Sequence, residues 1–95
     1  MIMSKLEDSR KEIDQINTEL VKLLEKRFAA VKGVVEYKKE NNLPVFDSAR
    51  EEEVLNKISE KVSNEELKPY IKEVFRDVMD VTKVWERDEL EKEGK

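Results

Sequence analysis

The chain has 95 residues, of which 44% are charged and 38% are hydrophobic, and it contains only two Gly and two Pro. Its formal net charge of −4 comes from 23 acids and 19 bases of interspersed sign, so no nucleic-acid or anionic-membrane partner is expected. The absence of Cys and His excludes disulfides, thiol nucleophiles, a His general base and the usual zinc sites. Since no apolar run resembles a secretion signal or a membrane span, a cytoplasmic protein is expected.

The N-terminal part of the chain predicts one very long helix, over about residues 4–41. It contains no Pro, and its apolar residues recur at a spacing of three and four. They are Ile13, Ile16, Leu20, Leu23, Leu24, Val31, Val34 and Val35. Such a helix is ~55 Å long, whereas a compact monomer of this size has a radius of gyration of ~13 Å. It would overhang its own domain, so we expect an obligate, intertwined homodimer.

A corner and a short second helix are expected next. Residues 42–47 predict an extended corner, because the residue before Pro44 is pushed out of the helical conformation. The second helix is predicted over about residues 48–62, where Ser48 and Glu51 have the spacing of a capping box.

A third, long helix is predicted to begin near residue 64 or 68 and to end near residue 91. Ser63 and Glu66 offer a second capping box, and Pro69 is tolerated only in a first helical turn. No strand-like alternation of useful length is present. The sequence therefore predicts one all-α domain of three helices over residues 1–95.

Two cations break the apolar stripe of the first helix. Arg27 lies on that stripe, and Lys38, eleven residues later, projects only about 20° away from it around the helix axis. Arg10 lies seventeen residues before Arg27 and points roughly a quarter-turn away. In a dimer, Arg10 could therefore reach the pocket of the partner chain.

The other two helices carry further polar residues at positions of the apolar pattern. Glu51 shares the face of the apolar residues on the second helix, with Arg50 beside it, and Thr82 and Glu86 lie four apart along the third. Each alone has a structural explanation, such as a helix cap or a charge whose stem is packed and whose head is solvated. Because burying unpaired charge is costly, their accumulation predicts a site for a polar ligand.

Three motifs along the chain resemble those of a known family. The pattern L-x-x-x-R-x-x-I-D runs from Leu6 to Asp14, L-V-x-L-L-x-x-R ends at Arg27, and P-V-x-D-x-x-R-E runs from Pro44 to Glu51. Together they resemble the small all-helical chorismate mutases of the stand-alone, monofunctional type. The resemblance implies an intertwined dimer with two shared active sites. It also implies an isomerase that rearranges chorismate to prephenate in phenylalanine and tyrosine biosynthesis.

The resemblance also implies roles for single residues. Arg10 from the partner chain, Arg27 and Lys38 would bind the substrate carboxylates, and Lys38 would also reach the ether oxygen. Glu51 and the backbone N–H of Asp47 would hold the ring hydroxyl.

Three further residues complete the implied site. Arg50 would support the cluster, and Thr82 falls where the family places a small polar residue near the ring carboxylate. Glu86 falls where bacterial members commonly have Gln, whose amide bonds the ether oxygen. An ionised Glu only accepts hydrogen bonds, so Glu86 must carry a proton to do the same. The catalytic set would be Lys38, Glu86 and Arg27, with no metal and no cofactor.

Three alternatives remain open at this stage. Isochorismate pyruvate-lyase shares the fold and a similar cationic pocket, although the corner sequence is more similar to that of the mutases. An aminodeoxychorismate mutase uses the same scaffold. A non-catalytic dimerisation or regulatory module would need only the apolar stripes, and it would tolerate Ala at Arg27, Lys38 and Glu51.

Overall fold

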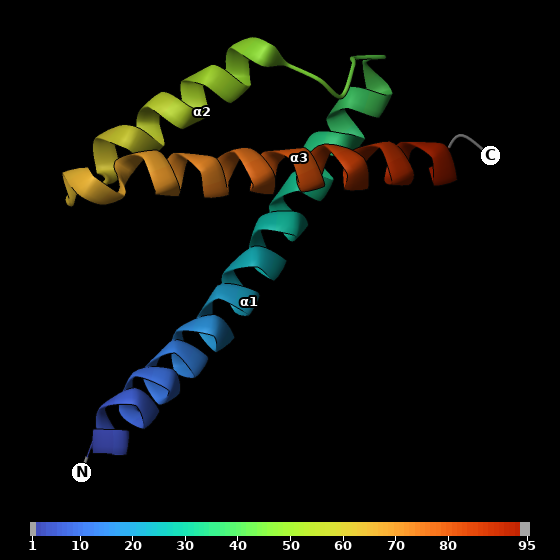
Figure 1. Cartoon of the computed structure of the whole chain (residues 1–95). Coiled ribbons are helices and arrows are strands. Elements are labelled where there is room, and N and C mark those ends of the chain that lie inside the picture. The colour runs from blue at the N-terminus through green and yellow to red at the C-terminus, as the bar shows by residue number, and fades with distance from the viewer. Residues whose placement is uncertain (1, 94–95) are drawn as a thin grey trace. The chain divides into compact units, whose positions relative to one another are not determined.

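The computed structural model describes the backbone of residues 2–93 and the side chains of residues 4–92. These residues form α1 (Ile2–Glu40), α2 (Ser48–Lys61), the single 3-10 turn η1 (Glu65–Leu67) and α3 (Lys68–Glu93), without a strand in the described range (Figure 1). The predicted all-α class, with one very long, one short and one long helix, is confirmed. The chain divides into two compact units, Met1–Ala30 and Val31–Lys95, and α1 contributes to both.

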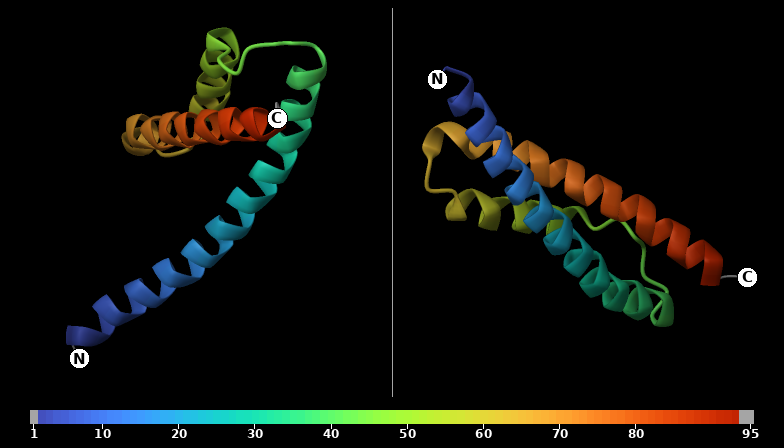
Figure 2. Two further views of the ribbon diagram at one scale, coloured as in Figure 1. Left: turned by 90° about the vertical axis from the view of Figure 1, so that its right-hand side faces the viewer. Right: turned by 90° about the horizontal axis from the view of Figure 1, so that it is seen from below.

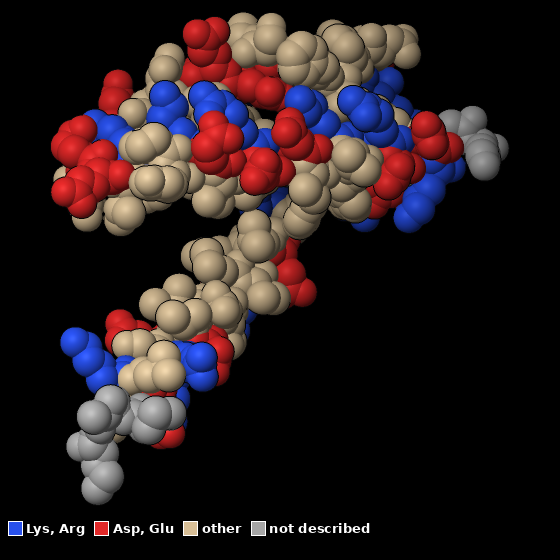
Figure 3. Space-filling view, in the orientation of Figure 1, with Lys and Arg blue, Asp and Glu red and all other residues tan. Residues whose placement is uncertain are grey.

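The unit Met1–Ala30 consists of a single helical segment, so it contains no second element against which its apolar stripe could pack. Large apolar side chains on this segment are 40–58% exposed. They are Leu6, Ile13, Ile16, Leu20, Val21, Leu23 and Leu24. Figure 3 shows mainly uncharged side chains along the middle of this segment. An isolated helix draws little stability from its backbone alone, and in this unit the apolar stripe remains exposed.

In the unit Val31–Lys95, α1 ends in a Schellman motif. The backbone N–H of Leu43 donates to the carbonyl of Lys38 at 2.9 Å, and that of Asn42 donates to the carbonyl of Lys39 at 3.4 Å. Asn42 has a φ of 53°, in the left-handed region that Asn tolerates better than most residues. The motif satisfies the carbonyls of Lys38 and Lys39 in the last turn of α1 and turns the chain into the corner before α2.

The start of α2 is capped by Asp47 rather than by a capping box. The Oδ1 atom of Asp47 accepts a hydrogen bond from the backbone N–H of Arg50 at 3.0 Å, and α2 begins at Ser48. The predicted pairing of Ser48 with Glu51 is wrong. Because Asp47 is extended and precedes the first helical residue, its carboxylate takes the capping position. The side chain of Glu51 is thereby left for another contact.

The second predicted capping box is also wrong. Asn64, rather than Ser63, is the N-cap of η1, and its Oδ1 atom accepts from the backbone N–H of Glu66 at 3.0 Å. The turn η1 leads directly into α3, where Pro69 occupies the first turn and its missing N–H has no helical partner to lose.

The Asp47 cap yields the first testable expectation. Asp47→Ala should lower the free energy of unfolding by about 1 kcal/mol, because it leaves an N–H of the first turn of α2 without its acceptor. Asp47→Asn is the matched control, since Asn caps as well as Asp. Urea denaturation at one fixed protein concentration measures both. Equal stability of the Ala and Asn variants would show that the cap contributes nothing.

Helices α2 and α3 lie side by side and are joined through residues 62–67 (Figures 1 and 2). Half-buried apolar side chains come from both helices. They are Val54, Leu55, Ile58, Ile71, Phe75 and Val78. Among the described side chains, those classed as buried are Val35 and Met79, which are apolar, and Thr82 and Glu86, which are polar. The best-enclosed part of the fold is therefore half polar, which is unusual for a core and typical of a site.

Candidate active site

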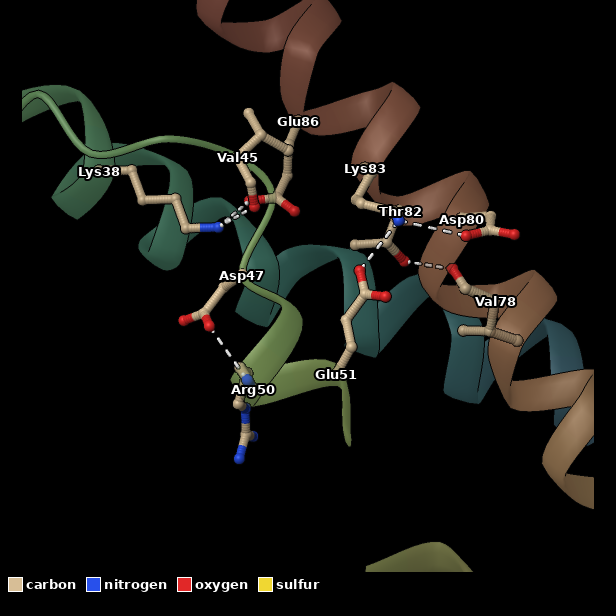
Figure 4. A network of polar contacts seen from close by, with 10 residues as sticks. All are labelled: Lys38, Val45, Asp47, Arg50, Glu51, Val78, Asp80, Thr82, Lys83 and Glu86. Atoms are coloured by element: carbon tan, nitrogen blue, oxygen red, sulfur yellow. Dashed lines mark hydrogen bonds and ion pairs between the residues drawn. The ribbon is translucent and has the colours of Figure 1, made fainter. Parts of the chain in front are cut away.

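The centre of the candidate site is an ion pair between Lys38 and Glu86. Lys38 lies in the last turn of α1, and its Nζ atom is 3.1 Å from Oε1 of Glu86 on α3 (Figure 4). The same Nζ atom donates to the carbonyl oxygen of Val45 in the corner at 2.8 Å. The two side chains are only 16% and 7% exposed. Two predicted site residues thus meet in an enclosed position, although the sequence did not indicate the contact with Val45.

Thr82 lies one helical turn before Glu86, and both side chains are buried. The hydroxyl of Thr82 donates to the carbonyl of Val78, with 2.6 Å between the oxygens. A threonine hydroxyl has one proton and can rotate. Thr82 was predicted to lie near the ring carboxylate, and to donate to such a group its hydroxyl would have to give up the bond to Val78.

Glu51 is held by Lys83, a residue that the sequence reasoning missed. The Nζ atom of Lys83 is 3.0 Å from Oε2 of Glu51 and 3.3 Å from Oδ1 of Asp80 (Figure 4). It also lies 4.8 Å from the ring centroid of Phe46, within the range of a cation–π contact. The hydrogen bond to Glu51 is the main reason that the pKa of Lys83 is raised above its usual value. One ammonium thus links the corner, α2 and α3.

A signal for Lys83 was present in the sequence. It follows Met79 by four residues and so lies on the same face of the third helix as the apolar stripe, as Arg27 does on the first. A third stripe cation could have been singled out by the same rule. The same rule could not have predicted that Lys83 pairs with Glu51.

Arg50 is not brought into this cluster. It is exposed, its Nη1 atom lies 2.6 Å from Oε1 of Glu53 on the same helix, and it points away from Glu51 in Figure 4. Glu53 also pairs with Lys57 at 3.2 Å. Lys57 first and Arg50 second hold the pKa of Glu53 below its usual value. Arg50 therefore belongs to a surface network along α2, and only its backbone N–H meets the predicted site residue Asp47.

Arg10 and Arg27 belong to the other unit, Met1–Ala30. Arg10 is exposed and Arg27 is half-buried. Seventeen residues along a helix separate them by ~26 Å. They are therefore too far apart to hold one small ligand together, as expected if they serve different sites.

The chemistry available in the unit Val31–Lys95 is that of cations and carboxylates. Among the residues that the structure describes, no group of three or more acidic, His or Cys side chains could hold a metal ion. Nor does any described helix have the length and apolar character to cross a bilayer. An enclosed ammonium beside a carboxyl group can bind a polar ligand and stabilise negative charge that develops on it.

The family match includes the residues of this cluster. Residues 9–87 match the model of the family described as chorismate mutase type II. Over 56 residues, which are 59% of this chain, the sequence is 41% identical to a bifunctional chorismate mutase/prephenate dehydratase of Aquifex aeolicus (strain VF5), and the chain covers only 16% of that relative. No solved structure matches the chain. Since the family match covers most of the sequence, including Lys38, Glu51 and Glu86, the chain belongs to the chorismate mutase type II family.

Proposed function

We propose that this chain catalyses the rearrangement of chorismate to prephenate. Its family membership supports the reaction class. The observation that carries the proposal is the enclosed pair of Lys38 and Glu86, 3.1 Å apart, because the resemblance assigns these two positions to the ether oxygen of the substrate. A buried pair of this kind adds little net stability, so a ligand role accounts for it better than a structural one.

The reaction is unimolecular and needs no nucleophile. The bond between the ether oxygen and the ring breaks while a carbon–carbon bond forms between the enolpyruvyl arm and the ring. The protein must hold the flexible arm over the ring and stabilise the negative charge that grows on the ether oxygen. Both tasks suit a site made of fixed cations and hydrogen-bond donors.

Lys38 is the proposed donor to the ether oxygen. An ammonium has three donors, and the carbonyl of Val45 and the carboxyl of Glu86 accept two of them. The third can reach the substrate. Since the other two bonds fix the ammonium before the substrate arrives, little reorganisation is needed as charge develops.

Glu86 is the proposed second donor. Its Oε1 atom accepts from Lys38, which leaves Oε2 to carry a proton. In that form Glu86 donates to the same ether oxygen, whereas the ionised form would repel it.

The remaining residues would orient the substrate. Glu51 and the backbone N–H of Asp47 would hold the ring hydroxyl, and Arg27 would bind a substrate carboxylate. Thr82 would lie near the ring carboxylate after its hydroxyl turns away from Val78. Arg50 would support the cluster only after leaving Glu53.

A product assay tests the function directly. Chorismate loss is followed by absorbance, and the product is identified by chromatography against prephenate. Formation of prephenate from chorismate is the expected result. If the protein releases pyruvate from isochorismate but forms no prephenate from chorismate, the lyase is favoured instead. If it turns over neither substrate, the proposed mutase function and the lyase alternative are both contradicted.

We also propose that two chains form a homodimer with shared sites. The apolar side chains of residues 6–24 are exposed on a helical segment that has no second element in its own unit. In a two-fold symmetric dimer, this surface would pack against the same surface of a second copy, and the apolar side chains of both would be buried. Arg10 lies on this segment and would reach the site of the partner chain.

Mixing variants tests the shared site. Arg10→Ala and Arg27→Ala chains should each be nearly inactive, but unfolding and refolding them together should restore about a quarter of wild-type activity. Half of the dimers are then mixed, and one of the two sites in each mixed dimer has both arginines. Refolding either variant alone is the control. Zero recovery, with mixed dimers shown by mass spectrometry, would rule out a role of Arg10 in the site of the partner chain.

A further inference from the structure

The ion pair between Lys83 and Glu51 changes what Glu51 can recognise. Glu51 is the proposed acceptor for the ring hydroxyl, and Lys83 lies 3.0 Å from its Oε2 atom. The two side chains are 26% and 18% exposed, so solvent screens the pair only in part. An ammonium, which Glu51 shares with Asp80, therefore already lies beside the carboxylate of Glu51 before a ligand arrives.

Lys83 is fixed in this position by three groups rather than one. Asp80, one turn earlier on α3, forms a second ion pair, with 3.3 Å between its Oδ1 atom and Nζ of Lys83. The centroid of the Phe46 ring lies 4.8 Å from the ammonium. Lys83 is charged at neutral pH, as lysines ordinarily are, and the hydrogen bond to Glu51 raises its pKa further. A ligand group that approaches Glu51 thus meets a fixed positive charge beside the carboxylate.

Chorismate and aminodeoxychorismate differ in the ring group that would face Glu51 in the proposed site. Chorismate presents a neutral hydroxyl, which can donate to a carboxylate oxygen that also accepts from Lys83. Aminodeoxychorismate presents an ammonium at the same ring position. A bare carboxylate would favour the ammonium, whereas a carboxylate paired with Lys83 sets two positive charges next to each other.

We propose that Lys83 is a specificity-determining residue that makes the site prefer a ring hydroxyl over a ring ammonium, by placing a positive charge beside Glu51 and orienting its carboxylate. This inference rests on the proposed mutase function. The inference also goes beyond the proposed function, because it assigns a role to a residue outside the implied catalytic set and distinguishes two substrate classes.

The test compares kcat/KM for chorismate and for aminodeoxychorismate. The ratio of the two should fall about tenfold in Lys83→Met, because the repulsion of the ammonium is removed. Lys83→Arg keeps the charge and should keep the ratio within about twofold. In the double variant Lys83→Met/Glu51→Gln the gain for the ammonium should disappear, because the carboxylate that attracts it is gone. Lys92→Met is the matched surface control, since Lys92 is 76% exposed at the far end of α3.

The ratio separates specificity from folding. A purely structural role of Lys83 would lower both kcat/KM values together and leave their ratio unchanged, and that result would overturn the inference. A wild-type protein that turns over neither substrate would overturn the proposed function and this inference with it. A wild type that rearranges chorismate, with the ratio unchanged in Lys83→Met, would overturn only the role of Lys83.

Discussion

Replacing Lys38 with Met is expected to lower kcat/KM for chorismate by about a thousandfold. Met is similar in length and apolar, so it fills the space of the lysine stem but donates nothing to the ether oxygen. The loss should appear mainly in kcat, because the charge on that oxygen develops only in the transition state. Steady-state kinetics at neutral pH measures it.

The same substitution also affects stability, and the two effects can be separated. Lys38→Met leaves the carboxyl of Glu86, in a side chain only 7% exposed, without its ammonium partner, which should destabilise the fold by about 3 kcal/mol. The double variant Lys38→Met/Glu86→Gln removes the unpaired charge and should regain most of that stability. It should not regain the activity, since the ammonium donor is still missing.

Lys39→Met is the matched control for Lys38→Met. Lys39 is the next residue of α1, is exposed, and carries the same charge, so its replacement should leave kcat/KM within about twofold. If Lys38→Met retains wild-type kcat/KM, the ammonium is not the donor to the ether oxygen. If the double variant regains activity along with stability, the ion pair is purely structural.

Glu86→Met is expected to lower kcat/KM for chorismate by about a hundredfold, whereas Glu86→Gln should keep it within about tenfold. The amide of Gln donates to the ether oxygen and still accepts from Lys38 through its carbonyl oxygen, so it replaces both hydrogen bonds of the proposed carboxylic acid. Met replaces neither of them.

The measurement is kcat/KM of the three proteins at one neutral pH and constant ionic strength. Glu89→Gln is a suitable control, since Glu89 lies one turn later on α3 and pairs only weakly with Lys92, at 3.9 Å. Its kcat/KM should equal that of the wild type. If Glu86→Met were as active as Glu86→Gln, Glu86 would not be a donor to the ether oxygen.

The local pattern of apolar and charged residues alone predicted the three helices and several candidate site residues. The spacing of apolar residues determined the three helices, because a helical period must face one side of each helix toward a core. The cations at Arg27 and Lys38 and the acid at Glu86 could be singled out because charge on an apolar stripe is costly unless it is used. The resemblance of the motifs then indicated the family, which the match over residues 9–87 confirmed.

What the sequence left open was which polar group contacts which. Asp47 rather than Ser48 caps α2, since both have suitable side chains and only the backbone conformation at the corner decides between them. Lys83 pairs with Glu51 from another helix, while Arg50 turns to Glu53 on its own. Chains with 44% charged residues offer many such pairings of similar energy. LPVFDSAREEEV, residues 43–54, therefore predicted a corner and a helix start. Only the tertiary structure placed Glu51 beside Lys83 and the carbonyl of Val45 beside Lys38.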